Sequence, residues 1–129
     1  MRNWIVLCLL CISAIANAQI NKVIGFWNTI DDKTGDMRSC IQITEKDGIY
    51  HGTIVAVYEK ENEGAVGTEI FIDMKVHKDH LKGKVYDPES GKTYFGKVSY
   101  EAKTDALVLR GSLDKAGLLG RSQTWERKK

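Results

Sequence analysis

The strongest constraint on this chain is the alternation of apolar and polar residues along short segments that are separated by turn-forming residues. In the segment 37–45, one face carries Met37, Ile41 and Ile43, and the other carries Arg38, Cys40, Gln42 and Thr44. Because successive side chains of a strand point to opposite sides of a sheet, each segment has one face for a core. A flat sheet would leave that face and two edges uncovered, so we predict that the sheet closes on itself.

Eight segments have this strand-like character, at residues 23–30, 37–45, 49–59, 68–77, 80–86, 92–101, 106–113 and 121–127. In the fourth, the expected inward face consists of Ile70, Ile72, Met74 and Val76. Asp-Gly, Thr-Gly and Ser-Gly steps in the connections supply the left-handed residue that hairpin turns need, and short turns join antiparallel neighbours. The sequence therefore predicts an all-β fold, an eight-stranded antiparallel up-and-down barrel.

The first 18 residues are predicted to be a secretory signal peptide. One positive charge in residues 1–3 precedes an apolar run over residues 4–15, and Ala16-Asn17-Ala18 has the pattern of a cleavage site. The run is short for a membrane span. We therefore expect residues 1–18 to be removed, residues 19–129 to form a single β-barrel domain, and the protein to be exported to the periplasm or secreted.

Charge and cysteine content narrow the possible partners. The formal net charge is +2, both signs are interspersed, and the only basic cluster is residues 127–129. We therefore expect no nucleic-acid partner. No second long apolar run follows residue 18, so no membrane span is expected either. Cys8 and Cys11 lie in the predicted signal peptide, which would leave Cys40 alone and no internal disulfide.

Two short features bear on how the barrel closes. Gly25-Phe26-Trp27 lies on the first strand and Arg121 starts the last, so they can meet only if these strands are neighbours. The pair resembles the signature of the calycin superfamily, which includes the lipocalins. This resemblance implies that Trp27 closes the base of the barrel, that Arg121 packs across its ring, and that Gly25 leaves room for the approach. Gly25, Trp27 and Arg121 are thus the expected structural closure residues.

The chain also resembles a narrower group, a bacterial family of secreted proteins known as domain of unknown function two-one-four-seven. The matching stretches run from the first strand to the last: residues 25–27, 31–35, 50–55, 87–94, 109–111 and 119–125. The resemblance implies the same fold and export, and it brings no established activity. Members of that family often have a longer central loop with a Cys pair, whereas residues 60–67 here form a short loop without cysteine.

Two clusters of polar residues could bind a metal ion, and each has a simpler interpretation. His77, Asp79 and His80 place two imidazoles and a carboxylate at one turn, which suits zinc or copper. No further Cys or His lies nearby in sequence, and a polar turn explains the trio equally well. Asp31, Asp32 and Asp36 resemble a calcium loop only loosely, because the longer ligand series of an EF-hand is missing. We expect no metal site and no cofactor.

The candidates for catalysis are few. Cys40 and His51 have the residue types of a nucleophile and its base, and they lie on neighbouring predicted strands. Such a coincidence is common by chance. Asp87, Glu89 and Glu101 supply carboxylates, but no pair is marked out for acid–base work, and residues 87–91 read as a hairpin turn. We therefore expect that the protein is not an enzyme.

Binding is the remaining class of function. A tyrosine offers apolar area with a polar tip, which suits a pocket wall, although the five tyrosines could also be core residues. We predict Tyr58, Tyr94 and Tyr100 as residues that bind a small apolar or amphipathic ligand. Large inward side chains suggest a small cavity or none. The alternative is a filled barrel that contacts an envelope protein through the loops 60–67 and 114–120, including Leu118 and Leu119.

Overall fold

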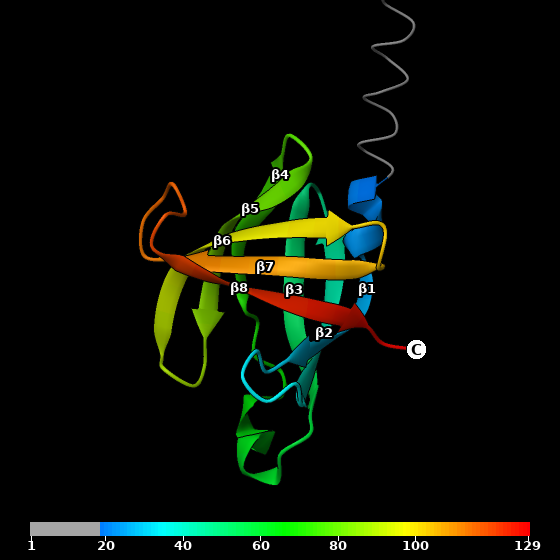
Figure 1. Cartoon of the computed structure of the whole chain (residues 1–129), viewed down its shortest axis with the longest axis vertical. Coiled ribbons are helices and arrows are strands. Elements are labelled where there is room, and N and C mark those ends of the chain that lie inside the picture. Colours follow the sequence, from blue (N-terminus) through cyan, green and yellow to red (C-terminus); the bar gives the residue numbers. More distant parts are fainter. Residues whose placement is uncertain (1–18) are drawn as a thin grey trace, which may run out of the picture.

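The computed structural model describes residues 19–129, and the predicted signal peptide lies outside the described residues. The chain folds into a closed antiparallel barrel in which each strand pairs with the next and β8 pairs with β1 (Figure 1). The elements are η1 (Asn21–Val23), β1 (Gly25–Ile30), β2 (Met37–Lys46), β3 (Ile49–Val57), η2 (Lys60–Ala65), β4 (Phe71–His77), β5 (His80–Asp87), β6 (Lys92–Glu101), β7 (Ala106–Ser112) and β8 (Gly120–Arg127). The predicted all-β, eight-stranded up-and-down barrel is confirmed.

The antiparallel order gives the barrel two different ends. At one end lie η1, the C-terminus and the connections β2–β3, β4–β5 and β6–β7. At the other lie the longer connections β1–β2, β3–β4 and β7–β8, together with the β5–β6 turn. Figure 1 shows η1 beside the β6–β7 connection and η2 projecting from the opposite end. We call the η1 end the closed end and the other the open end.

Most of the predicted inward residues of β2 are in the core. Ile41 and Ile43 are fully buried, as the alternation predicts. The prediction for Met37 is wrong: Met37 is exposed, and the pairing of β1 with β2 shifts beside it, at Thr29/Ile30. An irregularity of this kind breaks the two-residue period, so a residue beyond it can change faces. Cys40 alternates with Ser39 and Ile41, which both line the cavity described below, and it is fully buried on the opposite face.

A bulge in β4 has the same effect. The pairing of β4 with β5 shifts between Ile72 and Lys75, and Asp73 has a positive φ of 50°. As a result Ile72, which the alternation places inside, is exposed, whereas Met74 is fully buried. Val76 pairs with the fully buried Leu81 but is itself exposed, near the end of β4. The carbonyl oxygens of Ile72 and Asp73 crowd β5: a Cβ on Gly83 would lie 2.8 Å from each of them. Gly83 is therefore required where the bulge presses on its neighbour.

Replacing Gly83 with alanine should lower the free energy of unfolding by about 1–3 kcal/mol, because rigid backbone atoms must move to admit the methyl group. Gly64→Ala is the matched control, since a Cβ there meets nothing within 4 Å and Gly64 has no positive φ. Urea unfolding of both variants checks this. Equal stability of the two variants would show that the bulge does not depend on Gly83.

The described residues contain no helix that is long and apolar enough to cross a membrane.

Cys40 is the free cysteine of this part of the chain, and burial raises the pKa of its thiol. A buried, protonated thiol is a poor nucleophile and is not accessible for a bond between two molecules.

Candidate ligand-binding site

The closed end is sealed by a tryptophan and an arginine. The fully buried Trp27 donates a hydrogen bond from Nε1 to the carbonyl of Val23 in η1, at 2.8 Å. The Arg127 guanidinium carbon lies 4.3 Å from the centroid of the Trp27 ring. Arg127 also donates to the carbonyl of Lys22 at 2.6 Å and to Asp105 Oδ2 at 2.8 Å. This arrangement joins β8, η1 and the β6–β7 connection across the base of the barrel.

The arginine on Trp27 is Arg127, which corrects the expectation for Arg121. In the register of β1 with β8, Trp27 faces Arg127, whereas Arg121 is the second residue of β8, at the open end. There Arg121 pairs with Asp32, and its side chain is 68% exposed. Because the two strands are antiparallel, a residue near the start of β1 meets the end of β8, and this rule alone points to Arg127 in the sequence. Gly25 does face the arginine, since a Cβ there would lie 3.0 Å from Arg127 Nη1.

The three tyrosines predicted to bind a ligand lie in different places. Tyr94 lines the cavity described below. Tyr100 donates to Asp105 Oδ1 at 2.7 Å, and this hydrogen bond is the main cause of the raised pKa of its phenol. It therefore belongs to the closed end. Tyr58 donates to Asn28 Oδ1 at 2.7 Å and is not among the cavity-lining residues. Tyr94 thus stays a prediction as a ligand contact, and the geometry assigns Tyr58 and Tyr100 to supporting hydrogen bonds.

A large cavity opens at the end opposite Trp27. Its volume is about 1490 Å³, which includes the space between the loops at the mouth. This corrects the expectation of a small cavity or none. The deeper wall is apolar and is formed by Ile41, Ile54, Ile70, Val85, Leu109 and Trp125. Trp125 is almost fully buried and stacks on Phe71 with a centroid distance of 6.4 Å, which fixes the orientation of its ring.

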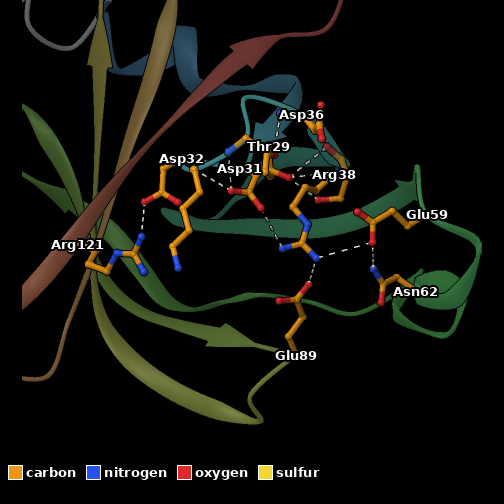
Figure 2. Close-up of polar contacts among 12 residues, drawn as sticks. Thr29, Asp31, Asp32, Asp36, Arg38, Glu59, Asn62, Glu89 and Arg121 are labelled. Carbon is orange, nitrogen blue, oxygen red and sulfur yellow. Dashed lines mark hydrogen bonds and ion pairs between the residues drawn. The ribbon is translucent and has the colours of Figure 1, made fainter.

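Ion pairs centred on Arg38 connect the loops of the mouth (Figure 2). Its guanidinium lies 3.7 Å from Asp31 Oδ2 and 4.0 Å from Glu59 Oε2, and it forms a closer pair with Glu89. Arg38 lies near the start of β2, and Glu89 lies in the β5–β6 turn. In an eight-stranded ring these positions are on opposite sides, so the pair crosses the mouth. Arg121 and Asp32 tie β8 to the β1–β2 connection beside it, since β8 and β1 are neighbouring strands (Figure 2).

The Asp-rich turn between β1 and β2 is organised by its own backbone. Asp31 Oδ1 accepts hydrogen bonds from the amides of Lys33 at 2.8 Å and Thr34 at 3.3 Å. The bond from Lys33 is the main cause of the lowered pKa of this carboxyl. Asp31 therefore shapes the turn and faces Arg38, and both interactions favour its charged form.

The other candidate groups do not converge. His80 Nδ1 lies 3.1 Å from Asp79 Oδ1, and the His77 ring meets the His80 ring edge-on. Within residues 19–129, no three His, Cys, Asp or Glu side chains are placed to hold a metal ion. Cys40 and His51 are separated along the sheet, because Cys40 faces Ala56 whereas His51 faces Thr44.

The acidic candidates also serve local structure. Asp87 accepts from the amide of Glu89 at 3.0 Å and from the Ser90 hydroxyl at 2.9 Å, which shapes the β5–β6 turn. Glu89 faces Arg38, and Glu101 accepts from the amide of Lys103 at 3.4 Å. These three carboxylates therefore do not form a pair suited to acid–base work in this arrangement.

Comparison with known proteins places the fold. No curated protein matches this chain. Among solved structures, protein HP1028 from Helicobacter pylori, described as belonging to the lipocalin family, shares 23% sequence identity with a TM-score of 0.65, and the match covers 82% of each chain. At this identity the likeness shows the fold. A family model described as an uncharacterized protein conserved in bacteria, DUF2147, matches residues 25–127, from the first residue of β1 to the last of β8. The chain therefore belongs to the DUF2147 family, and its barrel is lipocalin-like.

Proposed function

We propose that this protein binds a small apolar or amphipathic molecule in the barrel, without catalysis. The observation that carries the proposal is the open cavity of about 1490 Å³ with an apolar wall and a polar rim. A cavity of this kind can hold a drug-sized molecule with most of its surface removed from water. The open cavity favours this proposal over the alternative, a filled barrel that acts through contacts with another protein.

The geometry also indicates which end of a ligand would lie where. The apolar part would pack against Ile54, Leu109 and Trp125, deep in the barrel. A polar head would lie at the rim, near Arg38 and the Thr29–Ser39 pair, whose hydroxyl oxygens are 2.7 Å apart. Polar groups at the rim would fix the orientation, while apolar burial would supply most of the affinity.

The head group of such a ligand would be uncharged or cationic. Arg38 already faces three carboxylates, those of Asp31, Glu59 and Glu89. A ligand carboxylate would have to displace one of them and would meet the others as like charges. The lysines at the rim, Lys33 and Lys92, are exposed, so each would contribute little to binding a single anion.

We also propose that the protein acts outside the cytoplasm. This rests on the signal-like pattern of residues 1–18 and on the export implied by the family resemblance. A lone buried cysteine is compatible with an oxidising compartment, because it is not accessible for pairing.

Titration with N-phenyl-1-naphthylamine, an uncharged apolar dye that fluoresces on leaving water, tests the proposed function. The purified protein should show saturable fluorescence enhancement with one site, and dodecanol should displace the dye competitively. The heat-unfolded protein under the same conditions is the control for nonspecific binding. Absence of saturable enhancement, or enhancement that no aliphatic competitor reverses, would refute a ligand site in the barrel.

The charge of the mouth predicts selectivity among ligands of equal chain length. Dodecanol should displace the dye at a concentration about tenfold lower than dodecanoate at neutral pH, which corresponds to about 1.4 kcal/mol. In Glu89→Gln one carboxylate is removed from the surroundings of Arg38. The difference between the displacing concentrations of dodecanol and dodecanoate should therefore become smaller. Competition curves for both proteins check this. Tighter binding of dodecanoate by the wild type would show that Arg38 is free to receive an anion.

A further inference from the structure

A strip of polar side chains lies on one side of the cavity, toward the mouth. Ser39 of β2, Thr29 of β1 and Gln123 of β8 all border the cavity, and these three strands are neighbours in the barrel. Trp125 of β8 also borders it, and the antiparallel register of β1 with β8 places this residue beside Thr29. We call Thr29, Ser39 and Gln123 the polar strip. A few polar groups in an otherwise apolar pocket are the ones that select a ligand.

The orientation of the Gln123 amide follows from its contact with Trp125. The indole Nε1 of Trp125 donates to Gln123 Oε1 at 3.3 Å, and an indole N–H can only donate. The amide oxygen is therefore the atom directed to the ring, and the NH2 group is left over. Within residues 19–129 the only side-chain hydrogen bond of Gln123 is this one, so its two N–H donors are available to a ligand.

The hydroxyl pair of the polar strip also has one donor to spare. Thr29 Oγ1 accepts from the amide of Ser39 at 3.1 Å, and the two hydroxyl oxygens lie 2.7 Å apart. One hydroxyl hydrogen fills the space between these oxygens, so the other must point elsewhere. The nearby carbonyl of Ser39 is 3.5 Å from Thr29 Oγ1, which is long for a hydrogen bond between oxygens. A ligand acceptor would receive the second hydrogen at a better distance.

The charged groups that border the cavity do not select a head group by their net charge, because both signs are present in similar number. Most of them are occupied by ion pairs or by turn amides: Asp31, Asp32, Arg38, Asp87, Glu89 and Arg121. The others form no ion pair with a described residue and are exposed: Lys33, Glu61 and Lys92. Exposed charges of this kind contribute little each. Selection of the head group therefore falls to the polar strip.

We propose that the ligand carries an uncharged carbonyl group, as in a ketone, ester or amide, and that Gln123 selects it. The proposal rests on the proposed function, since it concerns the ligand of the same cavity. A carbonyl oxygen has two lone pairs, so it can accept from the Gln123 NH2 group and from the spare hydroxyl of the polar strip. An ammonium head group is itself a donor and finds no acceptor on the Gln123 NH2 group. The uncharged head group is thereby favoured over the cationic one.

Competition between two ligands of equal chain length tests the role of Gln123. The polar group of 2-dodecanone is one carbonyl, whereas dodecylamine is protonated at neutral pH. Each is titrated against the purified protein with bound N-phenyl-1-naphthylamine. With wild type, 2-dodecanone should displace the dye at a concentration about tenfold lower than dodecylamine, as expected for one or two additional hydrogen bonds.

Gln123→Glu is the most informative variant, because it keeps an oxygen for Trp125 and replaces the NH2 donor with a second acceptor oxygen. The preference for 2-dodecanone over dodecylamine should fall by about tenfold or reverse. Thr124→Glu is the matched control: it adds the same carboxylate to the next residue of β8, which does not border the cavity. There the preference should stay within about twofold of wild type. Thermal unfolding reports whether each variant is folded.

The outcomes separate the carbonyl proposal from the proposed function. If the dye binds but dodecylamine displaces it as well as 2-dodecanone does, or if Gln123→Glu folds and keeps the wild-type preference, the carbonyl proposal is refuted and the ligand site stands. If the dye does not bind wild type, both are refuted. Should Gln123→Glu fail to fold, Thr29→Val/Ser39→Ala replaces it: the loss of both hydroxyls should weaken 2-dodecanone about fivefold and leave dodecylamine unchanged. An equal loss for both ligands would overturn the proposal.

Discussion

Replacing Arg127 with alanine should lower the melting temperature by roughly 10 °C, the effect of about 2–3 kcal/mol in a domain of this size. The variant loses the contact with the Trp27 ring, for which ~1–2 kcal/mol is typical when the cation is partly desolvated. It also loses the charge-assisted bonds to Asp105 and to the carbonyl of Lys22, and so loosens η1 from the barrel. Differential scanning calorimetry measures the shift.

Arg121→Ala is the matched control for this experiment. It removes the same side chain from the same strand, but at the open end, where Arg121 is 68% exposed and pairs with Asp32. An exposed ion pair contributes about 0–1 kcal/mol, so the melting temperature should shift by a few degrees at most. If the two variants melted together, or if Arg121→Ala were the less stable, the closure role would return to Arg121.

Part of the stability that Arg127 contributes depends on pH. The pKa of Asp105 lies below its ordinary value of 3.8, chiefly because Arg127 donates to its carboxylate. A carboxyl whose pKa is lowered by folding stabilises the protein above its unfolded pKa, and this contribution disappears as the pH falls through the folded pKa. The difference in melting temperature between wild type and Arg127→Ala should therefore become smaller as the pH falls below 3.8. It should not close, because the contact with Trp27 does not need Asp105.

The architecture could be predicted because alternation survives in most strands. Ile41 and Ile43 lie inside as their spacing requires, and the Asp-Gly and Ser-Gly turns fix antiparallel neighbours. The alternation does not reveal the extra residue in β4, which puts Ile72 outside. The bulge fits against Gly83 on the next strand, β5, and the alternation within β4 contains no information on that fit. A residue count alone therefore cannot place a bulge.

The cavity was missed for a related reason. Composition shows that the interior contains large residues, but not where along the barrel they lie. The fully buried Trp27, Ile43 and Leu107 pack near the closed end. Toward the mouth the cavity is lined by smaller residues such as Thr29, Ser39 and Gly111. A barrel packed at one end can thus be hollow at the other, and sequence resemblance to a family without established activity gave no indication of this uneven filling.

Filling the cavity at Gly111 should abolish the proposed ligand binding while the barrel stays folded. Gly111 borders the cavity from β7, and a Cβ there would meet only the Tyr94 Cβ, at 3.7 Å, which is ordinary contact. Its φ is not positive, so the backbone accepts a side chain. In Gly111→Phe the ring would occupy the space between the mouth and Leu109. Affinity for N-phenyl-1-naphthylamine should fall by at least about tenfold, since the ligand then loses apolar burial of more than about 1.4 kcal/mol.

Val108→Phe is the control for this variant because it places the same ring on the same strand outside the cavity. Val108 alternates with the inward Leu107 and Leu109 and does not border the cavity. Dye affinity should therefore stay within about twofold of wild type, and both variants should keep the β-sheet circular dichroism of the parent. If Gly111→Phe folds and binds the dye as wild type does, the dye site lies elsewhere and the barrel is not the binding chamber. If only Gly111→Phe loses the dye, the ligand occupies the space that this glycine leaves open, and Tyr94, which lies beside it on β6, becomes the first wall residue to replace.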